Sequence, residues 1–348
     1  MTSDAALDAL LLPLNQGLLT AAPDTLFLRA REGAGLHARG QRDALTCVQP
    51  FKPWDDALQR AGFDVASDLP SRTFDQVWLL PPRQREEARA LIAQAFDSCE
   101  PGGVVVASVA NDEGAKAIEG DFKKLAGALD GTLSKFHCRV FWAKRDDARI
   151  DADVWAQWRK ADAPRSILEG RFVSRPGVFA WNRVDVGSEL LAEHLPSNVR
   201  GAAADLGAGW GFLSDALLTH NPGITTLDAL EADARALELA RQNLAAHADR
   251  CDIHFHWHDV TAGLPVGRKY DVIVSNPPFH DTGKASQPEI GKRFLQVAAE
   301  ALAPRGTFWL VANAHLPYEA LLAERFVDVR VVVSAKGYKV FEARGVKR

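Results

Sequence analysis

The feature that most constrains this chain is an internal duplication. Residues 74–82 read "FDQVWLLPP" and residues 270–278 read "YDVIVSNPP", and the two segments align without a gap. Each is a short apolar run typical of a buried strand, and each ends in two prolines. Proline fixes its own φ and restricts the residue before it, so each run ends in a rigid elbow. The chain is therefore expected to repeat one folding plan.

The similarity continues after the elbows. A helix-like segment follows in each copy, "REEARALIAQAFDSC" in the first and "EIGKRFLQVAAEAL" in the second. A turn ("EPGG" or "APRG") and a β-rich run come next, and later "RVFWAKR" at 139–145 aligns with "KVFEARG" at 339–345. The order strand, helix, turn, strand is that of βαβ units, and the late strands indicate an antiparallel edge.

Length and composition fit two domains of similar size. The chain has 348 residues, of which 47% are hydrophobic and 25% charged, as in globular proteins with a packed core. We predict an α/β fold with domains at 1–150 and 151–348, joined through the polar, proline-containing stretch 146–170, which contains one short helix.

The sequence favours a cytoplasmic location. The N-terminus lacks the pattern of a signal peptide, and no apolar stretch reaches the roughly 20 residues that span a bilayer. The four cysteines are scattered, with no C-x-x-C pair, so neither a zinc site nor a disulfide framework is indicated.

The two copies differ before the elbow. In the second, "AAADLGAGWGFLSDALL" (202–218) reads as a strand, a glycine-rich turn and a helix. In the first, "DTLFLRAREGAGLHARG" (24–40) predicts no clear strand, turn and helix. Gly207, Gly209 and Gly211 allow a ligand close to the backbone, at the helix N-terminus where open α/β sheets bind nucleotides.

Acidic residues end the strands around this turn. Asp205 precedes the glycines, where it would repel a pyrophosphate but suit an amine or a sulfonium. "ITTLDALEAD" ends in Glu231 (or Asp228), which can accept both ribose hydroxyls, and "IHFHWHDV" ends in Asp259, placed to meet an adenine amino group. Any one of these acids could instead cap a helix. Together they predict an S-adenosylmethionine site formed by Asp205, Gly207, Gly209, Glu231 and Asp259.

Three histidines alternate along the same stretch. His254, His256 and His258 point to one face of a strand, but no fourth ligand has a clear spacing. We predict a polar strand face and no metal site.

The elbow of the second copy has the groups needed to methylate a weakly nucleophilic amine. The side-chain oxygen of Asn276, which we also place beside the cofactor, and the carbonyl of Pro277 can each accept an N–H of the amine. Phe279 offers a flat face on which a base can stack, flanked by Pro278 and His280. We predict Asn276, Pro277 and Phe279 as catalytic, and Pro278, Phe279 and His280 as substrate-binding.

The first copy has Leu80 where the second has Asn276. Its elbow is therefore predicted to be a structural turn, and its domain to be an inactive, degenerate copy that recognises RNA or acts as a scaffold.

These motifs resemble a known family. "DLGAGWG" with "SNPPFH" resembles the class I S-adenosylmethionine-dependent methyltransferases that modify exocyclic or amide nitrogens. "RFVSRPGVFAWNRVDVGSELLAEHLP" and "LVANAHLPYEALLAERF" narrow the resemblance to bacterial ribosomal RNA guanine-N2 methyltransferases, the small-subunit enzymes more than the large-subunit ones. The resemblance is strong from about Arg171 to the end.

The resemblance implies methylation of the 2-amino group of a guanosine in 16S ribosomal RNA, and two tandem class I methyltransferase-like domains. It implies that Asp205, Gly207 and Gly209 bind the methionine part, Glu231 the ribose, Asp259 the adenine, and Asn276 to Phe279 the guanine. The family commonly has Cys or Asn between the first two glycines and a small or polar residue after the second. This chain has Ala208 and Trp210 there, and the bulky Trp210 either narrows the pocket or stacks on a neighbour.

The predicted partner is ribosomal RNA or the small subunit, and we expect a monomer. A net charge of −4 neither indicates nor excludes RNA, since steering depends on local patches. One candidate patch is the basic tail (Lys336, Lys339, Arg344, Lys347 and Arg348); the other is the basic–aromatic region 155–183, about half of whose aromatic residues we expect in the core.

Three alternatives remain: a large-subunit RNA methyltransferase, a protein-glutamine methyltransferase, and a non-catalytic RNA-binding assembly factor. The glutamine enzymes combine a helical N-terminal domain with an elbow ending in Tyr, unlike this chain. An assembly factor suits the first copy but not the second.

Overall fold

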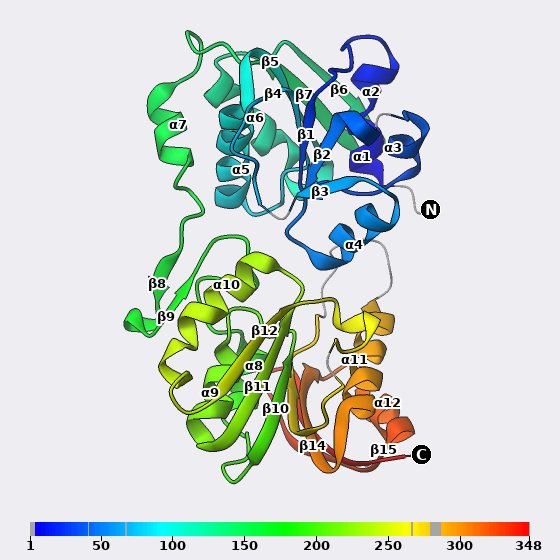
Figure 1. The fold of residues 1–348 in the computed structure, drawn as a ribbon, viewed down its shortest axis with the longest axis vertical. Coiled ribbons are helices and arrows are strands. Elements are labelled where there is room, and N and C mark those ends of the chain that lie inside the picture. Colours follow the sequence, from blue (N-terminus) through cyan, green and yellow to red (C-terminus); the bar gives the residue numbers. More distant parts are fainter. Residues whose placement is uncertain (1–3, 41, 67, 266, 279–286, 348) are drawn as a thin grey trace. The chain divides into compact units, whose positions relative to one another are not determined.

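The computed structural model describes residues 4–40, 42–66, 68–265, 267–278 and 287–347, and the chain divides into two compact units. The first comprises Met1–Pro164 with Arg175–Gly177, and the second comprises Arg165–Ser174 with Val178–Arg348. Each has its own seven-stranded sheet with helices on both faces (Figure 1). Each unit is described by itself below.

The sheet of the first unit has the order β3-β2-β1-β4-β5-β7-β6. Strands β1 to β5 pair in parallel, and β7 pairs antiparallel with β5 and β6. The bounds are β1 Thr25–Leu28, β2 Leu45–Val48, β3 Asp64–Ala66, β4 Phe74–Leu79, β5 Cys99–Ala110, β6 Gly131–Lys135 and β7 Cys138–Lys144.

The sheet of the second unit repeats this plan strand for strand, with the order β12-β11-β10-β13-β14-β16-β15. The predicted tandem α/β fold and its antiparallel edge are therefore confirmed. The bounds are β10 Arg200–Leu206, β11 Gly223–Glu231, β12 Asp252–Trp257, β13 Tyr270–Ser275, β14 Leu302–Asn313, β15 Phe326–Ala335 and β16 Tyr338–Val346; a separate hairpin is formed by β8 Arg165–Ile167 and β9 Phe172–Ser174.

Helices bury an apolar layer against each sheet face. In the first unit, α5 and α6 cover one face, where the rings of Phe96, Phe122 and Phe141 pack at 5.3 and 5.1 Å. No helix in the described ranges is long and apolar enough to cross a membrane. The α-helices are α1 Ala5–Leu10, α2 Leu12–Asn15, α3 Ala34–Ala38, α4 Lys52–Arg60, α5 Arg85–Ser98, α6 Ala115–Ala126, α7 Ala152–Trp158, α8 Val186–Ala192, α9 Phe212–His220, α10 Ala234–Asn243, α11 Gln287–Ala301 and α12 Tyr318–Arg325.

The stretch 24–40, for which the sequence predicted no clear strand, turn and helix, forms a shortened version of them. Strand β1 has four residues and α3 five, against seven in β10 and nine in α9. Gly33 precedes α3 without a side-chain cap. The sequence prediction was wrong here because β1 is held by pairing with β2 and β4, which are distant in sequence.

The chain leaves the first unit later than the predicted boundary at residue 150. Helix α7 packs on the first unit, where Trp158 is buried, and the Trp155 indole N–H donates to the carbonyl of Ala93 at 3.3 Å. The first unit therefore continues to Pro164.

The predicted turns "EPGG" and "APRG" are bulges within strands. Pairing of β4 with β5 passes from Phe74↔Cys99 to Gln76↔Val104, and β13 with β14 shows the same shift. A Cβ added to Gly103 would lie 2.6 Å from the carbonyl oxygen of Asp75, and one added to Gly306 would lie 2.6 Å from that of Tyr270. Both bulges therefore need glycine.

Gly103→Ala is expected to lower the free energy of unfolding of the first unit by about 1–3 kcal/mol, because the new methyl group would overlap backbone. Differential scanning calorimetry would measure the change. Gly120→Ala is the matched control, because Gly120 lies in α6 with nothing within 4 Å of its added Cβ among the described residues. The free energy of unfolding of that control should rise by about 0.5–1 kcal/mol, because alanine favours a helix interior over glycine. Equal melting temperatures for the two variants would contradict the role of the bulge.

Candidate functional site

The glycine-rich turn and the elbow begin at neighbouring strand ends. Leu206, the last residue of β10, pairs with Leu230 of β11 on one side and with Ser275 of β13 on the other. The Ser275 hydroxyl, fully buried, donates to the Leu206 carbonyl at 2.7 Å. Strand order reverses at β10, and open α/β sheets bind ligands at such a switch point, beyond the carboxyl ends of the strands.

The turn after β10 depends on glycine. Gly207, Gly209 and Gly211 have φ of 81°, 56° and 92°, in the left-handed region. Gly211 begins α9 against α10, where an added Cβ would lie 3.3 Å from Leu244. No described atom lies within 4 Å of a Cβ added to Gly209. The turn therefore leaves open space beside Gly209.

Asp205 carries an unmet hydrogen-bond acceptor beside this turn. Its side chain is 0% exposed, and Oδ2 accepts from the Ser214 hydroxyl at 2.7 Å. Oδ1 is buried and has no partner among the described residues. Burial raises the pKa of Asp205 to about 7, although the Ser214 hydrogen bonds act in the opposite direction. A cationic or N–H donor at the turn would satisfy this oxygen, as the ammonium of a methionine moiety would.

Glu231 links the end of β11 to the turn. Oε2 accepts from the Gly209 N–H and Oε1 from the Asp233 N–H, each at 2.8 Å. Burial raises the pKa of Glu231 to about 7 despite these bonds. The carboxyl group is thus held against the turn, where a ribose would lie.

Asp228, the alternative to Glu231, lies three residues inside β11. It is 1% exposed and accepts from the Tyr270 hydroxyl at 2.8 Å, from His256 Nε2 at 2.7 Å and from Arg268 at 3.1 Å. This network occupies Asp228 and leaves Glu231 as the acid at the sheet edge.

Asp259 is a helix N-cap, which is the alternative role that the sequence left open for each of the three acidic residues. Its Oδ1 accepts from the N–H and the hydroxyl of Thr261 at 2.8 and 2.7 Å, at the start of the short helix Val260–Ala262. The residue still lies two positions beyond β12, at the same edge. Its contact with adenine remains a prediction.

The three histidines face different groups, and the buried His254 Nε2 makes no hydrogen bond among the described residues. His256 bonds Asp228, His254 lies 3.1 Å from Asp252, and His258 Nε2 lies 2.6 Å from the Gly263 carbonyl. No cluster of potential metal ligands occurs in the part of the chain that the structure describes.

The Asn276 amide is fixed by two acceptors. Its Nδ2 donates to Asp185 Oδ2 at 2.9 Å and to Ser188 Oγ at 2.8 Å. Pro277 is buried and Pro278 exposed, whereas Phe279 and His280 lie outside the described residues.

Asp185 and Ser188 were missed by sequence reasoning. Asp185 caps α8 by accepting from the Ser188 N–H at 2.9 Å. Asp4 caps α1 in the first unit in the same way, and α1 and α8 pack on corresponding strands, but these equivalences become visible only in the folded units.

Strand registers place different residues at the corresponding positions of the first unit. Leu28 pairs with Val48 and Leu79, as Leu206 pairs with Leu230 and Ser275. The residues that match Asp205, Gly207, Gly209, Glu231 and Asn276 are therefore Phe27, Arg29, Arg31, Gln49 and Leu80.

These replacements fill the corresponding edge. Arg29 pairs with the buried Glu87, and Arg31 bonds Asp4 at 3.0 Å and lies 4.5 Å from the Trp54 ring. Gln49 donates to the Ala30 carbonyl at 2.6 Å. Where the second unit has acidic residues and a glycine-rich turn, the first unit therefore has two arginines paired with acidic residues and a glutamine bonded to the backbone.

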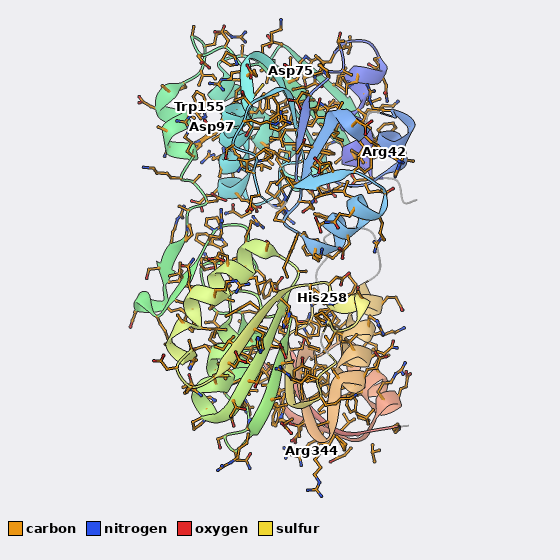
Figure 2. All side chains as sticks on the ribbon, in the orientation of Figure 1. Arg42, Asp75, Asp97, Trp155, His258 and Arg344 are labelled. Carbon is orange, nitrogen blue, oxygen red and sulfur yellow. The ribbon has the colours of Figure 1, made fainter. Side chains whose placement is uncertain are left out.

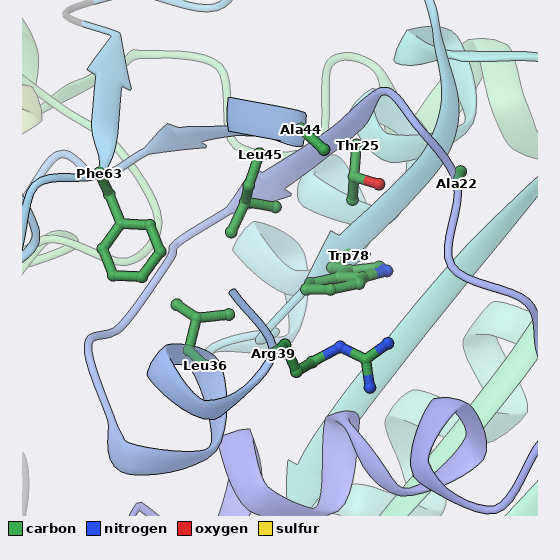
Figure 3. Close-up of a pocket in the computed structure, with 8 residues that line it drawn as sticks. All are labelled: Ala22, Thr25, Leu36, Arg39, Ala44, Leu45, Phe63 and Trp78. Atoms are coloured by element: carbon green, nitrogen blue, oxygen red, sulfur yellow. The ribbon is translucent and has the colours of Figure 1, made fainter. Parts of the chain in front are cut away.

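A small cavity in the first unit is not a remnant of that site (Figure 3). Thr25 and Leu45, the first residues of β1 and β2, line it together with Trp78 and Arg39. It measures about 10 Å³, room for about one water molecule. Thr25 and Leu45 lie at the strand ends away from the elbow, although Trp78 comes from near the carboxyl end of β4.

Trp210 is a structural anchor. It is 4% exposed, and its ring packs 5.2 Å from that of Phe172 and 5.8 Å from that of Phe212. Its indole N–H donates to the Phe179 carbonyl at 3.2 Å. The ring packs edge-on against Phe172 and tilted against Phe212 rather than stacking on them, and the residue ties the segment before α8 to the glycine-rich turn.

The basic–aromatic region 155–183 is divided between the two units. Trp158 and Phe172 are core residues, as expected of about half of the aromatics. In the first unit, Trp155 lies near Arg145 and Arg159, and Arg159 pairs with Asp97 (Figure 2). In the second, Phe179 is 62% exposed.

The tail is not one basic patch. Lys336 and Lys339 lie at the β15–β16 turn and pair with Glu189 and Glu319. Arg344, labelled in Figure 2, lies further along β16 and pairs with Glu342. In the described part of the tail, β16 spaces these charges along an extended strand, and contact of the tail with RNA stays a prediction.

The fold and this sheet edge define a methyltransferase of the small-domain class. A family model described as "Methyltransferase small domain" matches residues 169–342.

The chain belongs to the ribosomal RNA small subunit methyltransferase C family. It is 33% identical to the Shewanella loihica protein of that name over 303 residues, covering 85% of this chain and 84% of that one. The Pseudomonas aeruginosa protein is 33% identical, with 82% and 83% covered. The 16S rRNA N2 G1207 methyltransferase of T. Thermophilus, solved with AdoMet and guanosine, superposes with a TM-score of 0.80 at 25% identity, covering 98% of this chain and 92% of that one.

A large-subunit relative matches a shorter part of the chain. Ribosomal RNA large subunit methyltransferase G of Alcanivorax borkumensis is 36% identical over 180 residues, which cover 51% of this chain and 45% of that one. The small-subunit relatives thus match both units, whereas this similarity covers half of the chain.

Asp205→Asn is expected to stabilise the second unit increasingly as pH rises. A carboxyl whose pKa is raised by folding contributes stability below its unfolded value, here 3.8, and loses it as pH rises through about 7. The variant has no such loss, so its advantage should grow between pH 5 and 7 by up to about 1.4 kcal/mol per pH unit. Urea unfolding at several pH values measures it. A difference that stays constant with pH would contradict the burial of an ionisable Asp205.

Proposed function

We propose that the second unit transfers a methyl group from S-adenosylmethionine to the 2-amino group of a guanosine in 16S ribosomal RNA. The observation that carries this proposal is the Asn276 amide, whose two N–H groups are occupied by Asp185 and Ser188. Its oxygen therefore remains as the acceptor for an amine, at the same sheet edge as the glycine-rich turn, which Asp205 of β10 and Glu231 of β11 flank.

The cofactor would be held at the edge formed by β10, β11 and β12. Asp205, Gly207 and Gly209 would bind the methionine part, Glu231 the ribose and Asp259 the adenine. The unmet Oδ1 of Asp205 and the open space beside Gly209 support this assignment. When bound, S-adenosylmethionine supplies a sulfonium-activated methyl carbon, whose bond to sulfur breaks as the amine nitrogen bonds to it.

The elbow would prepare the amine for attack. The lone pair of an exocyclic amine is delocalised into the base, so the nitrogen must become pyramidal before it can react. Asn276 Oδ1 and the Pro277 carbonyl would each accept a hydrogen bond from one N–H of the amine. The rigid prolines fix the direction of both acceptors in advance. Pro278, Phe279 and His280 would hold the guanine extruded from its stack. No strong general base is needed, because the nitrogen becomes acidic only as its new bond forms, and solvent takes the proton.

The relatives support RNA as the substrate over the other candidates. The superposed enzyme was solved with guanosine, and the small-subunit relatives match both units of this chain. A protein-glutamine enzyme would have a helical first domain, whereas the first unit here is α/β. An assembly factor without activity would not need the unmet acceptor of Asp205. Large-subunit RNA is the remaining alternative, favoured only by the shorter match.

The first unit would recognise RNA or act as a scaffold. The sequence predicted it to end near residue 150, and in the structure it continues to Pro164. Because other residues stand at the positions that match the predicted cofactor site, the first unit would not bind S-adenosylmethionine. Since bacterial ribosomal RNA lies in the cytoplasm, we place the enzyme there, acting as a monomer on ribosomal RNA or the small subunit.

The replaced edge of the first unit predicts one S-adenosylmethionine per chain. Isothermal titration calorimetry should give a stoichiometry of one, and Asp205→Phe, which introduces the residue found at the matching position Phe27 of the first unit, should remove the binding. A stoichiometry of two would contradict the degeneracy of the first unit.

Asn276→Ala is expected to lower methyl transfer to 16S rRNA by about a hundredfold or more, the effect of removing one transition-state hydrogen-bond partner. Radiolabelled transfer under single-turnover conditions measures the rate. The affinity for S-adenosylmethionine, measured by calorimetry on the same variant, should stay within about twofold because the cofactor is held mainly by other residues. Full activity in this variant would refute the catalytic role of the elbow.

A further inference from the structure

The acceptors that hold Asn276 come from one short stretch at the start of α8. Asp185 is the N-cap of this helix and Ser188 lies in its first turn. Asp185 Oδ2 accepts both the Ser188 N–H at 2.9 Å and Asn276 Nδ2 at 2.9 Å. Ser188 Oγ accepts the second amide hydrogen at 2.8 Å. The two donors of Asn276 are therefore satisfied within the protein, and a single acceptor remains.

This pairing permits one orientation of the amide. An ionised carboxylate only accepts hydrogen bonds, so it must face the NH₂ end of Asn276. The flipped amide would set Oδ1 against Asp185 Oδ2 with no hydrogen between them. Asp185 thus directs Oδ1 away from α8, and a freely rotating amide would present donors and acceptor alternately to the substrate.

The same contact strengthens the acceptor. Hydrogen bonds donated by an amide polarise it and increase the negative charge on its oxygen, more so in a poorly solvated site. Positive charge develops on the amine nitrogen during transfer, so a more negative Oδ1 favours the transition state over the ground state.

Packing fixes α8 in place. The helix contacts β14 and β16, and a Cβ added to Gly187 would lie 3.0 Å from the ring of Tyr338. Glycine at this position lets the ring of Tyr338 close on the helix beside Asp185. Asp185 and Ser188, which together clamp the Asn276 amide, therefore belong to a helix packed on the same sheet that carries the elbow. This packing limits the movement of Asp185 and Ser188 relative to Asn276.

The first unit is a natural comparison for this network. Asp4 caps α1 as Asp185 caps α8, but Leu7 stands at the position of Ser188 and Leu80 at that of Asn276. Asp4 bonds Arg31 instead, at 3.0 Å. The first unit, which lacks the elbow amide, thus keeps the aspartate cap but has no hydroxyl at the position of Ser188.

We propose that Asp185 and Ser188 are positioning residues that orient and polarise the Asn276 amide for methyl transfer. This inference rests on the proposed function of the elbow, and it assigns a role to the segment before the glycine-rich turn.

The test uses the full chain, S-adenosylmethionine and 16S rRNA. Asp185→Ala should lower the single-turnover rate about ten- to a hundredfold, as misplacement of a reacting group does. Ser188→Ala, which leaves the helix cap intact, should lower it less. The calorimetric affinity for S-adenosylmethionine should stay within about twofold in both, so the loss appears in kcat rather than in cofactor binding.

Asp4→Ala is the matched control, because it removes the equivalent cap from α1 without touching an elbow amide. Its rate should remain at the wild-type level. The double variant Asp185→Ala with Asn276→Ala should be no slower than Asn276→Ala alone, since Asp185 acts through Asn276.

The outcomes separate this inference from the proposed function. If Asn276→Ala retains full transfer, the proposed function fails. If Asn276→Ala is inactive while Asp185→Ala and Ser188→Ala keep wild-type rates, only the positioning role fails. An equal loss in Asp4→Ala, or a further loss in the double variant, would show a general structural effect and would also overturn it.

Discussion

The site depends on the pairing of β10 with β13. Ser275 donates its buried hydroxyl to the Leu206 carbonyl at 2.7 Å, so the last residues of the two strands are joined by a side chain as well as by the sheet. The glycine-rich turn starts one residue beyond Leu206 and Asn276 follows Ser275. A rigid core would therefore bring a cofactor bound at the turn close to a base bound at the elbow, as the proposed function requires.

The duplication separates architecture from chemistry. Both units share the same strand order, the same bulge glycines and the same double-proline elbow. They differ at the sheet edge, where buried acids and an open turn in the second unit correspond to Phe27, paired arginines and Gln49 in the first. An ionised Asp205 costs about 4 kcal/mol to keep buried, given its shift from 3.8 to about 7.

The sequence predicted the parts that local patterns determine. The repeated elbows and the strand, helix, turn, strand order were sufficient for the tandem α/β fold. The cofactor edge that the glycine spacing and the acids at strand ends indicate stays a prediction. The clamp on Asn276 was not predictable in this way, because Asp185 lies 91 positions earlier in the chain and meets Asn276 only in the folded sheet. Strand β1 and helix α3 were missed because tertiary pairing stabilises them.

The most direct test of the account is radiolabelled methyl transfer from S-adenosylmethionine to isolated small and large ribosomal subunits and to their stripped RNAs, with the modified nucleoside identified. An Asn276 that accepts from an exocyclic amine, in a chain of the small-subunit family, is expected to give N2-methylguanosine in 16S rRNA alone. Label in large-subunit RNA, in protein, or in a nucleoside other than N2-methylguanosine would contradict it.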